Sequence, residues 1–229
     1  MASDDTNATT VAVRTTLPRL PLPSSSEWPA IHTERLLLRP LTQDDLEAYY
    51  TLRQQPEFMA ESSLGKPDSD ISETQAALDD LVNPERENFL FGIFIAATGE
   101  LIGDGGIHTI RFGPLGWPEI GYKLAPAHWG RGYGTESMSG LLKAWWQLPR
   151  QEAEIKVHPN SPWKKEEVEG SILSREHVVA EIATYNKGSQ RVLEKLGFRH
   201  FGTWEEPDTQ LHRLGQPLEL GHYALSSPS

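Results

Sequence analysis

Three glycines at alternate positions, Gly130, Gly132 and Gly134, stand in the segment Glu119–Ser137. The segment reads as a short strand, a glycine-punctuated loop and the first turn of an amphipathic helix. The first backbone N–H groups of a helix have no internal partner, and the helix dipole adds partial positive charge there. Glycines also let the main chain approach a phosphate without an obstructing Cβ atom. This spacing therefore predicts an anion site whose expected ligand is a phosphate.

The residue patterns of other well-known sites are missing from the chain. There is no Gly-x-x-x-x-Gly-Lys-Ser/Thr run, which excludes a P-loop. A dinucleotide fingerprint needs Gly-x-Gly-x-x-Gly at the start of a βαβ unit, whereas this chain has Gly-x-Gly-x-Gly after an expected hairpin. The eight histidines show no His-x-x-x-His or carboxylate partner spacing, which predicts no metal site. A glycine-rich turn without a ligand is the structural alternative.

Composition limits the class of protein. The 229 residues suit one sizeable domain, alone or with tails. The lack of cysteine excludes disulfides and thiolate chemistry. A net charge of −11 disfavours binding to nucleic acid. An apolar run of about 18 residues, as a membrane span requires, does not occur. The N-terminus also lacks the layout of a secretion signal, so we expect a cytoplasmic protein.

Hydrophobic periodicity predicts the elements that position the glycine loop. Four helices are expected. Two begin with capping pairs at Thr42 and Ser72, one follows the glycine loop, and one begins at Asn186. The expected strands are Arg35–Arg39, Phe89–Ala97, Leu101–Ile110, Glu119–Leu124, Val178–Thr184, Phe198–Trp204 and Leu218–Leu225. This order implies a mixed sheet flanked by helices.

The two remaining regions lack a sustained hydrophobic period. Residues 1–29 are rich in Ser, Thr and Pro and are predicted to be a mobile tail, before a domain that spans 30–226. Residues 150–176 are charged and irregular, which predicts a surface insertion, although Glu154–Val157 fits a short strand.

Three blocks of the sequence resemble one known family. Gly130-Arg-Gly-Tyr-Gly-Thr-Glu136 resembles the acyl-CoA loop of the GNAT superfamily of N-acetyltransferases, whose pattern Gln/Arg-x-x-Gly-x-Gly/Ala falls on Trp129 to Gly134. Trp129 departs from the usual first residue, but Trp-Gly-x-Gly-Tyr/Phe is typical of the branch that contains the ribosomal-protein N-terminal acetyltransferases. Two further blocks resemble that branch: Thr33-Glu-Arg-Leu-Leu-Leu-Arg-Pro-Leu41, and Asn186-Lys-Gly-Ser189 followed by Val192-Leu-Glu-Lys-Leu-Gly-Phe198.

The resemblance implies a fold and a cosubstrate. The implied fold is the α/β GNAT fold, with a twisted, mostly antiparallel mixed sheet, flanking helices and a splayed central strand pair. Acetyl-CoA is the implied cosubstrate. Leu124 and Ala125 are expected to pair with its pantetheine amides, and Asn186 and Ser189 to hold the pantetheine arm. The expected pyrophosphate site comprises Trp129, Gly130, Arg131, Gly132, Tyr133, Gly134 and Thr135.

The same resemblance implies direct attack of an amine on the thioester in a ternary complex. The amine must first lose a proton, and Glu119 is the expected base because it begins the strand that leads into the loop. Glu181 is the reserve candidate. Many family members carry a tyrosine acid at the position of Leu193. Ser189 is therefore the expected acid for the thiolate, with Tyr185 or water as alternatives.

The acceptor is expected to be either a protein or peptide N-terminus or a small-molecule amine. The acidic chain favours a cationic acceptor by electrostatic steering. We expect a monomer or homodimer that binds neither nucleic acid nor a membrane. A non-catalytic acyl-CoA-binding or interaction protein of the same fold is the alternative function.

Overall fold

The structure is a computed structural model that describes residues 10–161, 166–168 and 171–228. The helices are α1 (Leu46–Arg53), α2 (Pro56–Met59), α3 (Ile71–Val82), α4 (Tyr133–Gln147) and α5 (Lys187–Lys195), with short 3-10 turns at Ser25–Glu27, Gln43–Asp45, Pro126–His128 and Leu211–Arg213. The strands are β1 (Val11–Pro18), β2 (Ile31–His32), β3 (Leu36–Arg39), β4 (Phe89–Ile95), β5 (Leu101–Thr109), β6 (Glu119–Leu124), β7 (Arg150–Val157), β8 (Glu166–Val168), β9 (Ser171–Leu173), β10 (His177–Ala183), β11 (Arg199–Pro207) and β12 (Pro217–Ser226).

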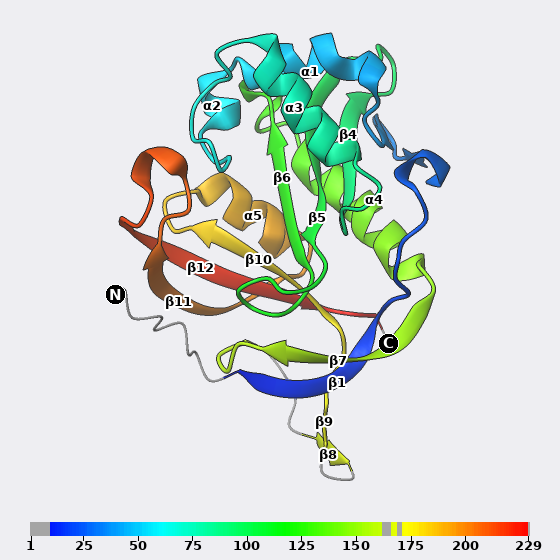
Figure 1. Cartoon of the computed structure of the whole chain (residues 1–229), viewed down its shortest axis with the longest axis vertical. Helices are drawn as coiled ribbons and strands as arrows, with labels where there is room; N and C mark the ends of the chain where they lie inside the picture. The colour runs from blue at the N-terminus through cyan, green and yellow to red at the C-terminus, as the bar shows by residue number, and fades with distance from the viewer. Residues whose placement is uncertain (1–9, 162–165, 169–170, 229) are drawn as a thin grey trace.

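The main sheet has the strand order β11-β12-β10-β6-β5-β4-β3-β2. Its neighbours pair antiparallel except β6 and β10, which run parallel and share a single bridge between Glu119 and Val179. From that bridge the two strands diverge (Figure 1). The predicted mixed, mostly antiparallel sheet with a splayed central pair is therefore confirmed.

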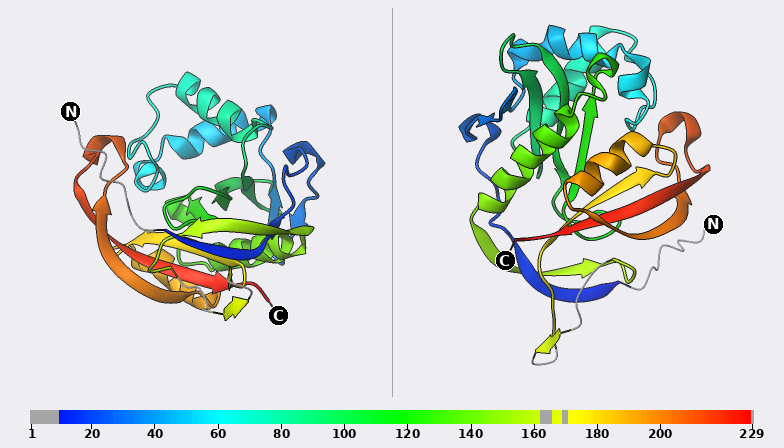
Figure 2. Two further views of the ribbon diagram at one scale, coloured as in Figure 1. Left: turned by 60° about the horizontal axis from the view of Figure 1, so that its bottom comes forward. Right: turned by 180° about the vertical axis from the view of Figure 1, so that it is seen from behind.

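Two hydrophobic cores cover opposite faces of this sheet. On one face, Met138 and Leu141 of α4 and Leu193 of α5 pack with Ile120 of β6. These two helices lie toward the viewer in the right-hand view of Figure 2. On the other face, helices α1 to α3 enclose a second core that includes Leu78. Alternation along each strand therefore assigns successive residues of β6 to different faces of the sheet.

The N-terminal segment differs from the prediction of a mobile tail. Residues 1–9 lie outside the described residues, but β1 pairs antiparallel with β7 along its whole length. Val13 and Leu17 are buried, and Val13 shares a third core with Val157 and Val179. This part of the chain is ordered because a strand distant in the sequence completes it.

The predicted surface insertion supplies β7, together with the short strands β8 and β9. They form a second sheet with β1, in the order β7-β1-β9-β8. This second sheet covers the face opposite α4 and α5, below helices α1 to α3 (Figure 1). Residues 162–165 and 169–170 of the insertion lie outside the described residues.

Local signals set most helix ends. Thr42 and Asp45 form the predicted capping box before α1. The N-cap of α3 is Asp70, whose side chain accepts from the N–H groups of Ser72 and Glu73, so the predicted cap at Ser72 is wrong. Asp70 is the stronger acceptor there because its carboxylate reaches two amides at once. No helix in the described part of the chain has the length and hydropathy to cross a membrane.

Candidate functional site

The glycine loop leads from β6 into α4 with its amides uncovered. Gly130 and Gly132 have φ of +71° and +84°, a left-handed conformation that favours glycine, and Gly132 is the N-cap of α4. The Glu136 N–H donates to the Gly132 carbonyl at 3.0 Å, which starts the helical hydrogen bonding. The N–H groups of Tyr133, Gly134 and Thr135 precede that bond and have no acceptor within the helix. These N–H groups are the ones on which the predicted anion site depends.

A carboxylate clamp holds this loop against the start of β3. Glu136 accepts hydrogen bonds from Thr33 Oγ1 at 2.6 Å, and from the backbone N–H and the Nε of Arg35 at 2.7 Å each. The Arg35 Nη1 donates to the Arg131 carbonyl at 3.0 Å, and its guanidinium lies 4.5 Å from the ring centre of Tyr133. Sequence reasoning missed this clamp, although Thr33 and Arg35 belong to one of the family-like blocks. The loop is thus fixed without a ligand.

At the edge of β6 beside the splay, the backbone groups of Leu124 and Ala125 differ in their hydrogen bonding. The Ala125 N–H donates to the Ile102 carbonyl at 2.8 Å, and its carbonyl accepts from the His128 N–H at 2.9 Å. Both backbone groups of Ala125 are therefore used within the protein, which argues against its predicted pairing with pantetheine. The Leu124 carbonyl accepts from Trp129 Nε1 at 2.6 Å. The indole thus occupies the acceptor that a pantetheine amide would need.

Ser189 and Tyr122 meet where α5 begins. The Asn186 side chain is the N-cap of α5 and accepts from the Ser189 N–H at 3.0 Å. The Ser189 hydroxyl is thereby left out of the cap, and the Tyr122 hydroxyl donates to it at 3.3 Å. Burial raises the pKa of Tyr122. Leu193, at the family's tyrosine position, is 1 % exposed and belongs to the core. Sequence reasoning did not identify Tyr122.

Tyr185, the alternative acid, belongs to a different contact. Desolvation and the Glu61 carboxylate raise its pKa, and Arg213 is its other charged neighbour. These residues come from the loops after α2 and β11, which are joined by a hydrogen bond from Gln210 Nε2 to the Ala60 carbonyl at 2.6 Å. Tyr185 is 56 % exposed. Its surroundings therefore differ from those of Ser189.

Glu119 begins β6 and lies on the face of the sheet opposite α4 and α5. Its neighbour Ile120 points into the α4 core, whereas the Glu119 side chain lies 3.5 Å from His108 Nε2 and is 13 % exposed. Burial, followed by the charges of Glu181 and Glu206, raises the pKa of Glu119 to about 8. A carboxylate in this setting is a stronger base than an exposed one.

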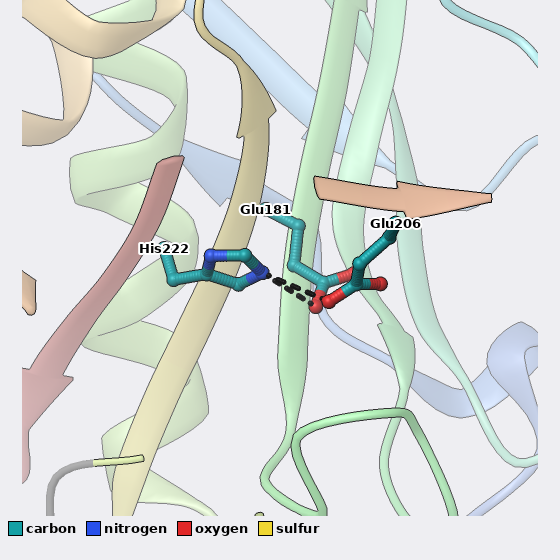
Figure 3. Close-up of side chains that lie close together, drawn as sticks. All are labelled: Glu181, Glu206 and His222. Carbon is teal, nitrogen blue, oxygen red and sulfur yellow. Dashed lines mark ion pairs between the residues drawn. The ribbon is translucent and has the colours of Figure 1, made fainter. Parts of the chain in front are cut away.

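Three further titratable side chains gather in one cluster (Figure 3), and two of them are the carboxylates that act on Glu119. Glu181 of β10, Glu206 of β11 and His222 of β12 come from neighbouring strands of the main sheet. His222 Nε2 lies 3.4 Å from Glu181 Oε1 and 3.3 Å from Glu206 Oε1. The structure thus brings both predicted carboxylates, Glu119 and Glu181, into one region. Glu206 and His222 were missed because only strand register brings them there.

These features border the splay between β6 and β10 from two sides. The loop amides, Leu124 and the Tyr122–Ser189 pair lie with α4 and α5, whereas Glu119 lies on the opposite face. The arrangement can hold an anionic carrier on one face and place a base on the other. A group transfer between ligands on the two faces is the chemistry that it supports.

The family model described as "Acetyltransferase (GNAT) domain" matches residues 35–199. The chain therefore belongs to the GNAT acetyltransferase family and is an acyltransferase. An uncharacterised N-acetyltransferase of Bacillus subtilis (strain 168), YoaA, is 26 % identical over 206 residues, which cover 88 % of this chain and 98 % of that protein.

Solved structures show the same fold. A GNAT-family acetyltransferase from Bacillus anthracis aligns with a TM-score of 0.63 at 20 % identity, covering 87 % of this chain and 99 % of that one. A spermidine N-acetyltransferase from Vibrio cholerae, solved with CoA and spermine, aligns with a TM-score of 0.59 at 16 % identity, covering 84 % and 96 % of the two chains.

Proposed function

We propose that the protein transfers an acetyl group from acetyl-CoA to a primary amine by direct attack in a ternary complex. The observation that carries this proposal is the splay of β6 and β10, which share only the Glu119–Val179 bridge. Uncovered loop amides border the splay on one face, and the partly buried Glu119 carboxylate with its raised pKa borders it on the other. The thioester and the amine thus approach one opening from opposite faces.

The cofactor side uses backbone groups more than side chains. The N–H groups from Arg131 to Thr135 bind the diphosphate, and the N-terminus of α4 adds positive charge. Leu124 pairs with the pantetheine arm once the Trp129 indole leaves its carbonyl. Acetyl-CoA supplies the activated acyl group, and Asn186 lies at the turn where the pantetheine arm enters.

The proton steps follow from the two faces. Glu119 takes a proton from the ammonium group of the acceptor, and the free amine attacks the thioester carbonyl. A carbon–nitrogen bond forms, the carbon–sulfur bond breaks, and the electron pair leaves with the thiolate. Ser189 gives its hydroxyl proton to the thiolate and regains one from the Tyr122 hydroxyl that donates to it. The attacking nitrogen releases its second proton to solvent as the amide forms, and solvent returns one proton to Tyr122.

The acceptor is a peptide N-terminus or a small-molecule amine. An acceptor amine arrives as a cation, which suits the net charge of −11. The Vibrio cholerae neighbour is a spermidine N-acetyltransferase, so polyamines belong in the first acceptor panel beside peptides.

Thermal unfolding with and without acetyl-CoA tests the binding step. A ligand at 100 times its Kd adds about 2.7 kcal/mol to the free energy of unfolding. Gly132→Ala is expected to abolish the shift because a Cβ enters the diphosphate site. Gly215→Ala is the matched control, since Gly215 has the same left-handed backbone (φ +76°) in the loop before β12. Equal shifts in both variants would contradict the assigned cofactor site.

Release of free thiol from acetyl-CoA in the presence of an amine panel tests the reaction. The panel contains spermidine, single amino acids and peptides that differ in the first residue. We expect thiol release with at least one of them, with the acetyl group found on nitrogen by mass spectrometry. Binding of acetyl-CoA without thiol release for every acceptor would support the non-catalytic alternative.

A further inference from the structure

We propose that Glu181, Glu206 and His222 form a site for a divalent transition-metal ion, with zinc as the probe. This inference goes beyond the proposed acetyl transfer and does not depend on it. Each side chain offers one ligand atom, and the three atoms lie within 4.8 Å of one another (Figure 3). The distance from His222 Nε2 to the nearer oxygen of each carboxylate is 3.4 Å for Glu181 and 3.3 Å for Glu206.

The observation that points to a ligand is the state of His222. Its side chain has no exposed surface, and neither ring nitrogen makes a hydrogen bond within the described part of the chain. Glu181 Oε1 is likewise buried without a hydrogen bond among the described residues. Buried polar atoms are nearly always satisfied, because leaving them unpaired costs free energy. An ion between Nε2 and the two carboxylates satisfies Nε2 of His222 and Oε1 of Glu181 together.

The two distances from His222 Nε2 agree with a zinc coordination shell. Zinc binds imidazole nitrogen and carboxylate oxygen at about 2.0–2.2 Å, and tetrahedral geometry then separates neighbouring ligands by about 3.4 Å. Both distances from Nε2 match that edge. The nitrogen ligand disfavours calcium and magnesium, which prefer oxygen donors only. Three protein ligands also leave one position for water or another small donor.

Surrounding residues fix the orientation of two of these ligands. Trp204 Nε1 donates to Glu206 Oε1 at 2.5 Å. The Trp204 ring also stacks on the imidazole of His222, with ring centres 3.5 Å apart and planes at 8°. The register pairs Glu181 with His222 directly across β10 and β12. Such supports hold metal ligands in place before the ion binds.

The test uses the full chain without a histidine tag, first dialysed against a chelator. Calorimetry with zinc chloride is expected to show one ion per chain, and cobalt(II) is expected to give a visible absorption band at the same stoichiometry. Glu181→Gln and Glu206→Gln should each weaken zinc binding at least tenfold. Trp204→Phe should weaken it about tenfold, as loss of an outer-shell hydrogen bond does. Glu205→Gln, an exposed neighbour on β11, is the matched control.

Several results would overturn this assignment. The first is no stoichiometric zinc binding by the parent chain, and the second is zinc binding that neither Glu181→Gln nor Glu206→Gln changes. The third is binding of an alkylammonium probe at these residues without zinc, which would assign them to the acceptor amine. Because Glu206→Gln should leave stabilisation by acetyl-CoA unchanged, these outcomes are separate from failure of the proposed transferase function.

Discussion

Glu119 is partly buried beside two carboxylates, which makes its substitution informative. Glu119→Gln keeps the shape of the side chain and removes the base. We expect kcat to fall about 10²–10⁴-fold, the usual contribution of a general base. The Kd for acetyl-CoA should stay within about twofold, because the cofactor binds on the opposite face of the sheet and does not contact this carboxylate. Thiol release and calorimetry measure the two quantities.

The control for this substitution is the exposed Glu205→Gln, which should leave both constants unchanged. Full turnover by Glu119→Gln would remove Glu119 from the mechanism. Glu181→Gln would then be the next variant to examine, since Glu181 lies in the same group of carboxylates.

The Tyr122–Ser189 pair allows the thiol step to be tested separately. Ser189→Ala removes the hydroxyl that faces the thiolate, and Tyr122→Phe removes the hydroxyl that donates to Ser189. We expect kcat to fall about 100-fold in each, the lower end of the range for acid catalysis. The double variant should be little slower than Ser189→Ala, because the two groups act in series. Tyr185→Phe should keep the parent rate, since Tyr185 interacts with Glu61 and Arg213.

Trp129 offers a spectroscopic signal of cofactor entry. Its indole donates to the Leu124 carbonyl, and 53 % of the residue is exposed. Acetyl-CoA binding should break this hydrogen bond and change the tryptophan emission, a change that Trp129→Phe should remove. The Phe variant should bind acetyl-CoA about 2- to 10-fold more tightly, because one hydrogen bond of typical net strength no longer competes. If acetyl-CoA still changes the emission of Trp129→Phe by the same amount, the signal comes from another tryptophan, and displacement of the Trp129 indole is contradicted.

Among the elements, α4 is joined to the start of β3 by Glu136, and this link fixes the shape of the glycine loop. Glu136→Gln keeps the size of the side chain but removes the charge that pairs with Arg35. A neutral amide cannot form the ion pair with Arg35 that holds the loop against the start of β3. We therefore expect the Kd for acetyl-CoA to rise about tenfold and Tm to fall. Glu194→Gln on the exposed face of α5 is the control, and equal Kd values for the two variants would argue against the clamp.

The elements also show which parts of the fold the sequence can reveal. The capping box at Thr42 and the glycine loop before α4 are local, so spacing alone predicted them. Strand β1 was missed because its alternating pattern is short and its partner β7 lies far along the chain. A Ser-, Thr- and Pro-rich composition then favoured a tail. Tertiary pairing overrode that local preference.

In the candidate site, too, residues that are adjacent in sequence were predicted, and residues that strand pairing brings together were missed. The loop from Trp129 to Thr135 is continuous in sequence and was predicted residue by residue. His222 joins Glu181 through strand register, and Glu206 joins them from a third strand. Spacing along the chain predicted no metal, and our zinc proposal departs from that expectation because register, not local spacing, sets this cluster.

For the whole molecule, stability depends on buried charges that join its parts. Glu176, which is 1 % exposed, accepts from Trp145 Nε1 at 3.1 Å and lies 3.1 Å from Arg150 Nε. It thereby connects α4, β7 and the start of β10. Burial raises the pKa of Glu176 to about 7 despite the nearby Arg150. Burial also lowers the pKa of His177 to about 4.

These shifts set opposite limits on the pH range of stability. The folded state favours protonated Glu176, so its contribution is complete below the ordinary pKa of 4.5 and is lost as pH rises through about 7. The folded state favours neutral His177, so its contribution is complete above 6.5 and is lost as pH falls toward about 4. The free energy of unfolding is therefore expected to be largest between these limits, near pH 5–6.

Glu176→Gln separates the alkaline limit from the acidic one. The amide still accepts from Trp145 and has no proton to lose, so the variant should not lose stability between pH 5.5 and 8.5 at this position. The parent protein loses this stability between pH 4.5 and about 7, so the part above pH 5.5 spans about 1.5 pH units and corresponds to about 2 kcal/mol, since one pKa unit is about 1.4 kcal/mol. Urea unfolding at the two pH values measures the difference, with Glu152→Gln, whose side chain is 88 % exposed, as the control. If the parent and Glu176→Gln lose equal stability over this range, burial of Glu176 is not what limits the fold at high pH.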